Sequence, residues 1–158
     1  MSETAFPSLD SYAKSLDMIS NKMIEDLRNN FLKRVDKNPE LYYVEDVERV
    51  KRNDWTVRRF LYNYKTKPDL SKGLEALDKA MKWRKAFAVL DINEEHFPQE
   101  LYCSAGAIIY GSDLNGSPLL ILRGKVGIKM KSWQKITQTY LVYLVEKIDS
   151  KEENNGFY

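Results

Sequence analysis

The sequence has few of the side chains from which disulfides and metal sites are built. Its 158 residues include one cysteine, Cys103, and one histidine, His96. A single cysteine excludes a disulfide within the chain, and a zinc site needs several Cys or His ligands. We therefore predict no metal site and no cofactor. His96 is interpreted as a helix-cap or surface residue, and Cys103 as a small buried residue.

Long apolar runs and a strong net charge are also missing. The longest apolar runs, residues 105–110 and 118–122, are far shorter than the roughly 20 residues that span a bilayer. The first residues contain neither the basic nor the apolar segment of a secretory signal. A net charge of +2 is too small to indicate a nucleic-acid partner. We expect a cytoplasmic protein that binds no nucleic acid.

No grouping of side chains that supports catalysis is evident. Cys103 and His96 are separated by Pro98, and no third side chain is placed to orient the histidine. The adjacent acidic residues at 94–95 and at 152–153 are typical of solvated turns, and nothing marks either pair as an acid and a base. The protein is therefore predicted not to be an enzyme and to have no catalytic residues.

Helical periodicity dominates the first two thirds of the chain. Apolar residues recur at helical spacing over residues 18–35, and a shorter helix is predicted over 45–52. Asn53 and Asp69 are placed to cap two further helices, the second running to about Phe87. These segments predict a lobe built from four helices.

The pattern changes in the last third. Residues 107–110 and 118–122 are apolar at consecutive positions, which suits buried strands, and turn-forming residues separate them. This arrangement predicts a β-hairpin. Helical spacing then returns from Ser132 to Ile148.

These elements divide the chain into three parts. We predict a loose tail over residues 1–17, a helical N-terminal lobe over 18–95, and a second lobe over 96–158 that a β-hairpin and a helix begin. The fold class is α/β, and mostly α over the residues given.

A basic stretch follows the hairpin. No acidic residue lies between Asp113 and Glu146. Basic side chains beside an anionic bilayer contribute about 1 kcal/mol each, so we interpret the stretch as a membrane-facing surface; the alternative is a solvated face that aids solubility. The predicted membrane-surface residues are Arg123, Lys125, Lys129, Lys131 and Trp133.

Three segments resemble a known family. Residues 53–61 (NDWTVRRFL) resemble the "D-x-x-L-L-R-F-L" helix of CRAL-TRIO lipid-binding domains, and residues 74–85 resemble that family's helix ending in W-R-K. Residues 110–119 (YGSDLNGSPL) resemble its hairpin, although Ser117 stands where arginine is usual. Residues 43–49 (YVEDVER) are similar to a segment of the CRAL-TRIO modules in motile-sperm-domain-containing membrane proteins of animals.

The resemblance implies a non-enzymatic domain that binds or transfers a lipid in an apolar cavity. It implies peripheral association with membranes, with lipid or an anionic membrane surface as the partner. Tethering partners at membrane contact sites would bind through C-terminal regions that are absent here, and association with the endoplasmic reticulum is expected only with a C-terminal anchor. The family's cavity needs strands and a gate helix beyond Tyr158, so the resemblance implies a fragment, truncated before the pocket is complete.

Within the second lobe, apolar strand and helix residues are candidates for part of the cavity wall. The alternative is that they pack against the helical lobe. The predicted lipid-pocket residues are Ile109, Ile121, Tyr140 and Leu144.

A second function remains open. The helical lobe, with Trp55, Phe60 and Trp83, is also consistent with a helical protein-interaction module of a membrane-contact-site tether. Trp83 is assigned to the core, between the helical lobe and the hairpin, rather than to a binding surface.

Overall fold

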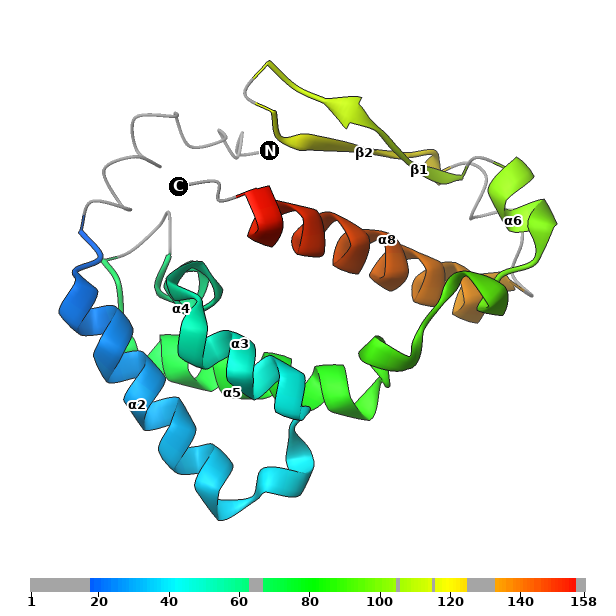
Figure 1. The fold of residues 1–158 in the computed structure, drawn as a ribbon. Coiled ribbons are helices and arrows are strands. Elements are labelled where there is room, and N and C mark those ends of the chain that lie inside the picture. Colours follow the sequence, from blue (N-terminus) through cyan, green and yellow to red (C-terminus); the bar gives the residue numbers. More distant parts are fainter. Residues whose placement is uncertain (1–17, 63–66, 105, 115, 125–132, 156–158) are drawn as a thin grey trace, which may run out of the picture. The chain divides into compact units, whose positions relative to one another are not determined.

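The computed structural model describes residues 18–62, 67–104, 106–114, 116–124 and 133–155, and it is mostly helical with one small antiparallel sheet (Figure 1). The predicted tail, residues 1–17, lies outside this range. The chain divides into an N-terminal unit, Met1–Ala88, and a C-terminal unit, Val89–Tyr158. This boundary precedes the predicted one at residue 95, because Ile92 packs against the core of the C-terminal unit.

The N-terminal unit contains the four helices that the periodicity predicts. They are α2 (Asn21–Lys37), α3 (Val44–Arg52), α4 (Asp54–Leu61) and α5 (Leu70–Ala86), with the short 3₁₀ helix η1 (Pro39–Leu41) between the first two.

Side chains cap three of these helices. The Asn53 side chain accepts hydrogen bonds from the backbone N–H groups of Trp55 and Thr56, and Asp69 accepts one from Lys72. Both predicted caps are confirmed. The Ser20 hydroxyl caps α2 in the same way, so backbone donors that each helix start leaves unpaired are satisfied.

The four helices enclose one apolar core. Phe31 from α2 packs edge-on against the Tyr42 ring at a centroid distance of 5.5 Å. The fully buried apolar side chains, drawn from all four helices, are Leu27, Phe31, Val50, Val57, Leu61, Leu77 and Met81. Truncating such residues typically costs about 2–5 kcal/mol, so this core holds the unit together.

Gly73 allows α5 to approach α4 closely. A Cβ atom at this position would lie 3.1 Å from the Phe60 carbonyl oxygen and 3.2 Å from a Leu61 methyl group. Judged from the sequence alone, Gly73 would only lower the stability of α5, by about 1 kcal/mol relative to alanine. The structure gives the reason for a glycine there, since a side chain would press on the neighbouring backbone.

A buried ion pair joins α3 to α5. The Arg84 Nε donates to an Asp46 carboxylate oxygen at 2.7 Å, and both side chains are less than a tenth exposed. Buried charges are rare unless they are paired, because removal from water is costly. This pair therefore fixes the two helices relative to each other.

Trp83 is not in the core, and our assignment of it was wrong. Its side chain is 47% exposed, and it stacks on Phe87 at a centroid distance of 5.0 Å. The helix turns Met81 and Arg84 inward instead, so Trp83 stands on the opposite side of α5 with its ring partly in water.

We expect the Trp83→Ala variant to lower the free energy of unfolding by only about 1 kcal/mol. The loss of one aromatic contact is worth about 0.5–1.5 kcal/mol, whereas truncation of a core tryptophan costs about 3–5 kcal/mol. Urea denaturation measures this, with Met81→Ala as the buried control on the same helix. A loss above about 3 kcal/mol would show that Trp83 is buried in solution.

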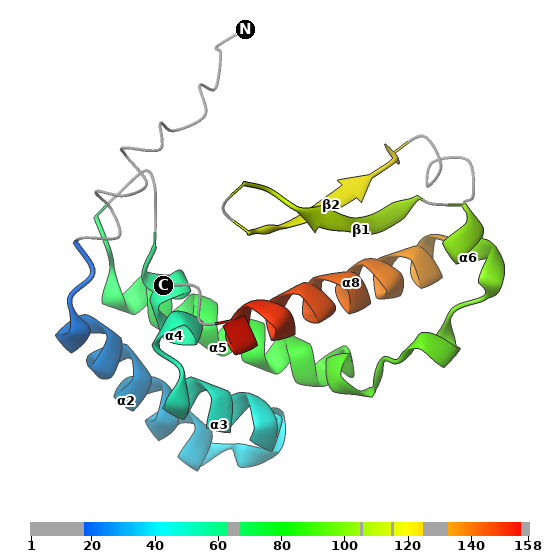
Figure 2. The same ribbon diagram turned by 45° about the horizontal axis from the view of Figure 1, so that its top comes forward.

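The C-terminal unit combines short helices, one hairpin and one long helix (Figure 2). Its elements are the 3₁₀ helices η2 (Val89–Asp91) and η3 (Glu94–His96), helix α6 (Gln99–Cys103), strands β1 (Ala107–Ser112) and β2 (Pro118–Leu122), and helix α8 (Gln134–Asn155). The predicted hairpin and the final helix are confirmed.

The antiparallel register gives the hairpin two different faces. Ala107 pairs with Leu122, and Ile109 pairs with Leu120; Ala107, Ile109 and Leu120 belong to the core of the unit, where β1 contacts α8. The next pair, Ile108 and Ile121, points the other way because side chains alternate along a strand. One face is therefore covered by α8, and the other is left more exposed.

The single histidine and the single cysteine of the chain both lie at the surface of this unit. His96 completes a capping box with Asn93 at the start of η3, as the cap interpretation predicts. Cys103 is exposed, so its assignment as a buried residue was wrong. It lies in the last turn of α6, a helix of five residues that buries Leu101 instead.

Candidate functional site

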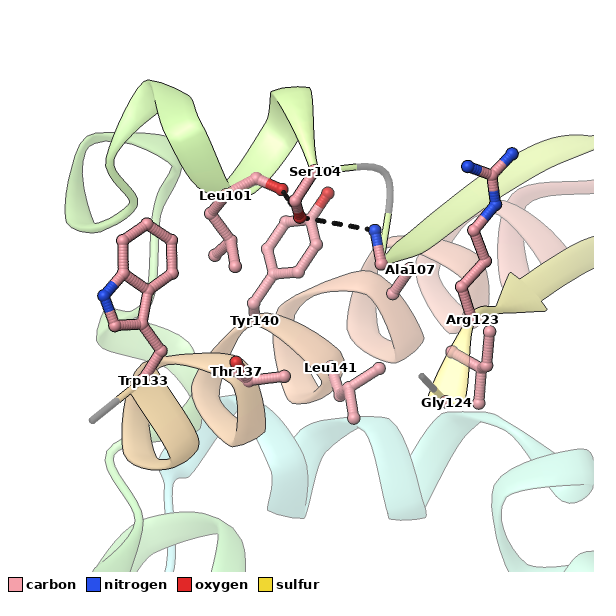
Figure 3. Close-up of a pocket in the computed structure, with 11 residues that line it drawn as sticks. Leu101, Ser104, Ala107, Arg123, Gly124, Trp133, Thr137, Tyr140 and Leu141 are labelled. Carbon is pink, nitrogen blue, oxygen red and sulfur yellow. Dashed lines mark hydrogen bonds between the residues drawn. The ribbon is translucent and has the colours of Figure 1, made fainter. Parts of the chain in front are cut away.

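A pocket of about 200 Å³ lies within the C-terminal unit, between the base of the hairpin, α6 and the first turns of α8 (Figure 3). Its walls are mostly apolar, and it is partly open to solvent. The lining residues are Leu101, Ser104, Gly106, Ala107, Leu122, Arg123, Gly124, Trp133, Thr137, Tyr140 and Leu141.

The periodicity of α8 explains one wall. Thr137 and Leu141 are four residues apart and share one face of α8, and Trp133, which directly precedes the helix, stands four residues before Thr137. Tyr140 lies on the same side of the helix. Figure 3 shows Tyr140 pointing from α8 toward Leu101 and Ser104, with Trp133 at one end of the pocket and Arg123 at the other.

The wall opposite α8 offers few polar atoms that could hydrogen-bond to a ligand. The Ser104 hydroxyl donates to the Leu101 carbonyl oxygen at 2.7 Å and accepts from the Gly106 backbone N–H at 3.4 Å. The side chain is thus engaged with its own backbone. A ligand that enters the pocket meets mainly carbon atoms on this side.

Tyr140 is the central side chain of the site. It is 5% exposed, and its ring lies 5.1 Å from Phe97 and 5.4 Å from Tyr102, both in edge-on geometry. Burial raises the pKa of its hydroxyl, with a further contribution from the neighbouring Tyr102. The hydroxyl therefore remains protonated, and no described residue forms a hydrogen bond with it.

A polar brace outside the pocket holds α8 against η3. One Glu94 carboxylate oxygen accepts from the Tyr143 hydroxyl at 2.6 Å and from the Lys147 ammonium at 2.8 Å. The bond from Lys147 lowers the pKa of Glu94, and Glu94 raises the pKa of Lys147. The brace keeps the aromatic side of α8 over Phe97, and so it positions Tyr140.

Among the described residues that line the pocket, Arg123 is the one that carries a charge. It directly follows β2, and its backbone N–H donates to the Gly106 carbonyl oxygen at 2.7 Å. Its side chain is exposed, and no described carboxylate forms an ion pair with it. A cation thus stands beside an apolar pocket whose other described lining residues are uncharged.

The four predicted lipid-pocket residues do not lie together: one lines the pocket, two pack in the core, and one is exposed. Tyr140 lines the pocket, whereas Ile109 and Leu144 pack in the core of the C-terminal unit. Ile121 is 40% exposed on the other face of the hairpin. The register explains this difference, because Ile121 pairs with Ile108, while the adjacent Leu122 pairs with Ala107 at the pocket.

Of the predicted membrane-surface residues, two are described. Arg123 is exposed beside the pocket, and Trp133 is one of its lining residues. Lys125, Lys129 and Lys131 lie outside the described residues. The structure thus brings the first cation and the tryptophan of the basic stretch to one pocket.

Apart from two glycines, six of the described lining positions were not identified from the sequence. Spacing along α8 could have identified Thr137 and Leu141, because they follow Trp133 at positions i+4 and i+8. No comparable pattern relates α6 to the hairpin. The unidentified positions, apart from the glycines, are Leu101, Ser104, Ala107, Leu122, Thr137 and Leu141.

Within the described residues, no group of three or more His, Cys, Asp or Glu side chains is arranged to hold a metal ion. No helix in this part of the chain is both long and apolar enough to cross a membrane. The comparisons with known proteins add no family to these observations. No protein-family model matches the chain, and no solved structure matches it.

Proposed function

We propose that the chain is a non-enzymatic lipid-binding module whose C-terminal unit accepts the apolar part of a lipid. The pocket beside Tyr140 is the observation that supports this most directly, because its lining is almost entirely apolar. Transferring a CH₂ group from water into such surroundings contributes about 0.8 kcal/mol. A few methylene groups therefore suffice for measurable binding.

The size of the pocket limits what enters it. Sites for drug-sized ligands usually measure about 300–1,000 Å³, whereas a dry cavity of about 150 Å³ is known to hold benzene. At about 200 Å³, the pocket matches one ring or a short length of alkyl chain. In this proposal the remainder of a larger lipid stays outside the described pocket, at a membrane or in solvent.

Filling the pocket tests the proposal. In the Thr137→Phe variant, a ring replaces a small side chain of the α8 wall, and we expect binding of a fluorescent short-chain lipid analogue to weaken at least tenfold. Gln138→Phe is the matched control, because Gln138 is the next residue of α8, is exposed and does not line the pocket.

Equal affinities of the two variants would contradict this assignment of the site. Circular dichroism establishes that both variants retain their helices. The unaltered chain, titrated in parallel, should bind as the Gln138→Phe variant does.

The alternative, a helical protein-interaction module of a membrane-contact-site tether, is favoured by a different observation. Trp83 is 47% exposed and stacked on Phe87, and exposed tryptophans are enriched among the residues that dominate protein interfaces. A partner that docks there would be lost in Trp83→Ala and retained in Thr137→Phe. Lipid binding should show the opposite pattern.

A further inference from the structure

From the position of Arg123 we infer that the pocket selects single-chain amphiphiles with an anionic head group over neutral or cationic ones of equal length. This inference rests on the proposed function, because it assumes that an apolar chain enters the pocket. It adds the chemical class of the ligand, which the apolar walls alone leave open.

The lining of the pocket differs between its two ends. Trp133 and Arg123 lie at opposite ends of the pocket, with Tyr140 and Leu141 between them (Figure 3). An alkyl chain that contacts Tyr140 and Leu141 therefore has one end near Arg123. A head group at that end is at the rim and remains in contact with water.

The charge of Arg123 favours an anionic head group. An arginine guanidinium such as that of Arg123 has five N–H donors and no acceptor. Guanidinium groups bind carboxylate and phosphate groups through bidentate hydrogen bonds. No described residue that lines the pocket supplies a competing negative charge, and no described carboxylate pairs with this arginine. An anionic head therefore meets a cation with which no described carboxylate pairs, while an ammonium head is repelled.

A head group beside Arg123 stays hydrated. Because the Arg123 side chain is exposed, the head keeps much of its water, and the large penalty for burying a charge does not arise. Exposed ion pairs are worth about 0.2–1 kcal/mol. At low ionic strength, where screening is weak, we expect the upper half of this range, which corresponds to a preference of roughly threefold to fivefold in affinity.

The test compares three probes of equal chain length: octanoate, octanol and octylammonium. Trp133 lines the pocket, so its fluorescence reports occupancy directly. Trp55→Phe and Trp83→Phe remove the other two tryptophans of the chain from the signal. We expect octanoate to bind roughly threefold to fivefold tighter than octanol, and octylammonium to bind weakest, at low ionic strength.

Variants at Arg123 make the comparison decisive, because substitutions at an exposed side chain leave the fold intact. In Arg123→Gln, octanoate and octanol should bind within twofold of each other. In Arg123→Glu, the order should reverse, with octylammonium the tightest probe. Octyl phosphate, titrated alongside, separates a preference for carboxylate from one for phosphate.

The outcomes distinguish the inference from the proposed function. If all three probes bind the unaltered pocket equally, the pocket takes apolar chains but Arg123 does not select among them, and the inference is overturned. If none of the probes changes the Trp133 signal, the proposed function fails together with it. An octanoate preference that persists in Arg123→Glu would also overturn the role of Arg123.

Discussion

Replacing Arg84 with methionine is expected to lower the free energy of unfolding of the N-terminal unit by about 3–5 kcal/mol. The substitution leaves the Asp46 carboxylate, which is 2% exposed, without the donor that lies 2.7 Å away. A buried charge that loses its partner retains its desolvation penalty without compensation. Chemical denaturation monitored by far-ultraviolet circular dichroism measures the loss.

The double variant Asp46→Leu, Arg84→Met is the control for this prediction. Replacing both members of a buried pair with apolar residues of similar size is often neutral or stabilising. We therefore expect the double variant to recover most of the stability that Arg84→Met loses. A single variant as stable as the unaltered chain would show that the pair is solvated in solution.

Replacing Phe97 with alanine is expected to unfold much of the C-terminal unit. Phe97 is 7% exposed, and its ring lies 5.1 Å from Tyr140 and 5.4 Å from Tyr143. Truncation of a core phenylalanine costs about 3–5 kcal/mol, a large share of the stability available to a unit with so small a core. Hydrogen exchange should show loss of protection in α8 and β1.

The N-terminal unit provides the internal reference for the Phe97→Ala experiment. Its helices have a separate core, so their exchange should change little. Leu114→Ala is the matched surface control, because Leu114 is fully exposed in the hairpin turn. Unchanged protection of α8 in Phe97→Ala would contradict the assignment of the aromatic cluster as the centre of the unit.

The helices of the N-terminal unit were predictable because local signals specify them. Apolar spacing over α2 and the capping residues Asn53 and Asp69 are encoded within a few neighbouring positions. Trp83 was misplaced because spacing gives the face of a helix only approximately. The Arg84–Asp46 pair turns α5 so that Arg84 is buried, and a contact across 38 residues has no local sequence signal.

The pocket was only partly predictable for the same reason. Of the residues predicted for a lipid pocket, Tyr140 lines the pocket of this structure, whereas Ile121 does not and its neighbour Leu122 does. A shift of one residue in a strand moves a side chain to the other face. The register Ala107–Leu122 is set by pairing across the hairpin, and the approach of α6 through Leu101 depends on tertiary packing.

The central claim is that an apolar chain binds beside Tyr140, and methyl-resolved nuclear magnetic resonance tests it most directly. The unaltered chain is titrated with octanoate while the leucine methyl signals are followed. We predict shifts concentrated at Leu101, Leu122 and Leu141, which line the pocket, with little change at Leu27 or Leu77 in the N-terminal core. No saturable shift at the pocket leucines, or shifts confined to the N-terminal unit, would contradict the claim.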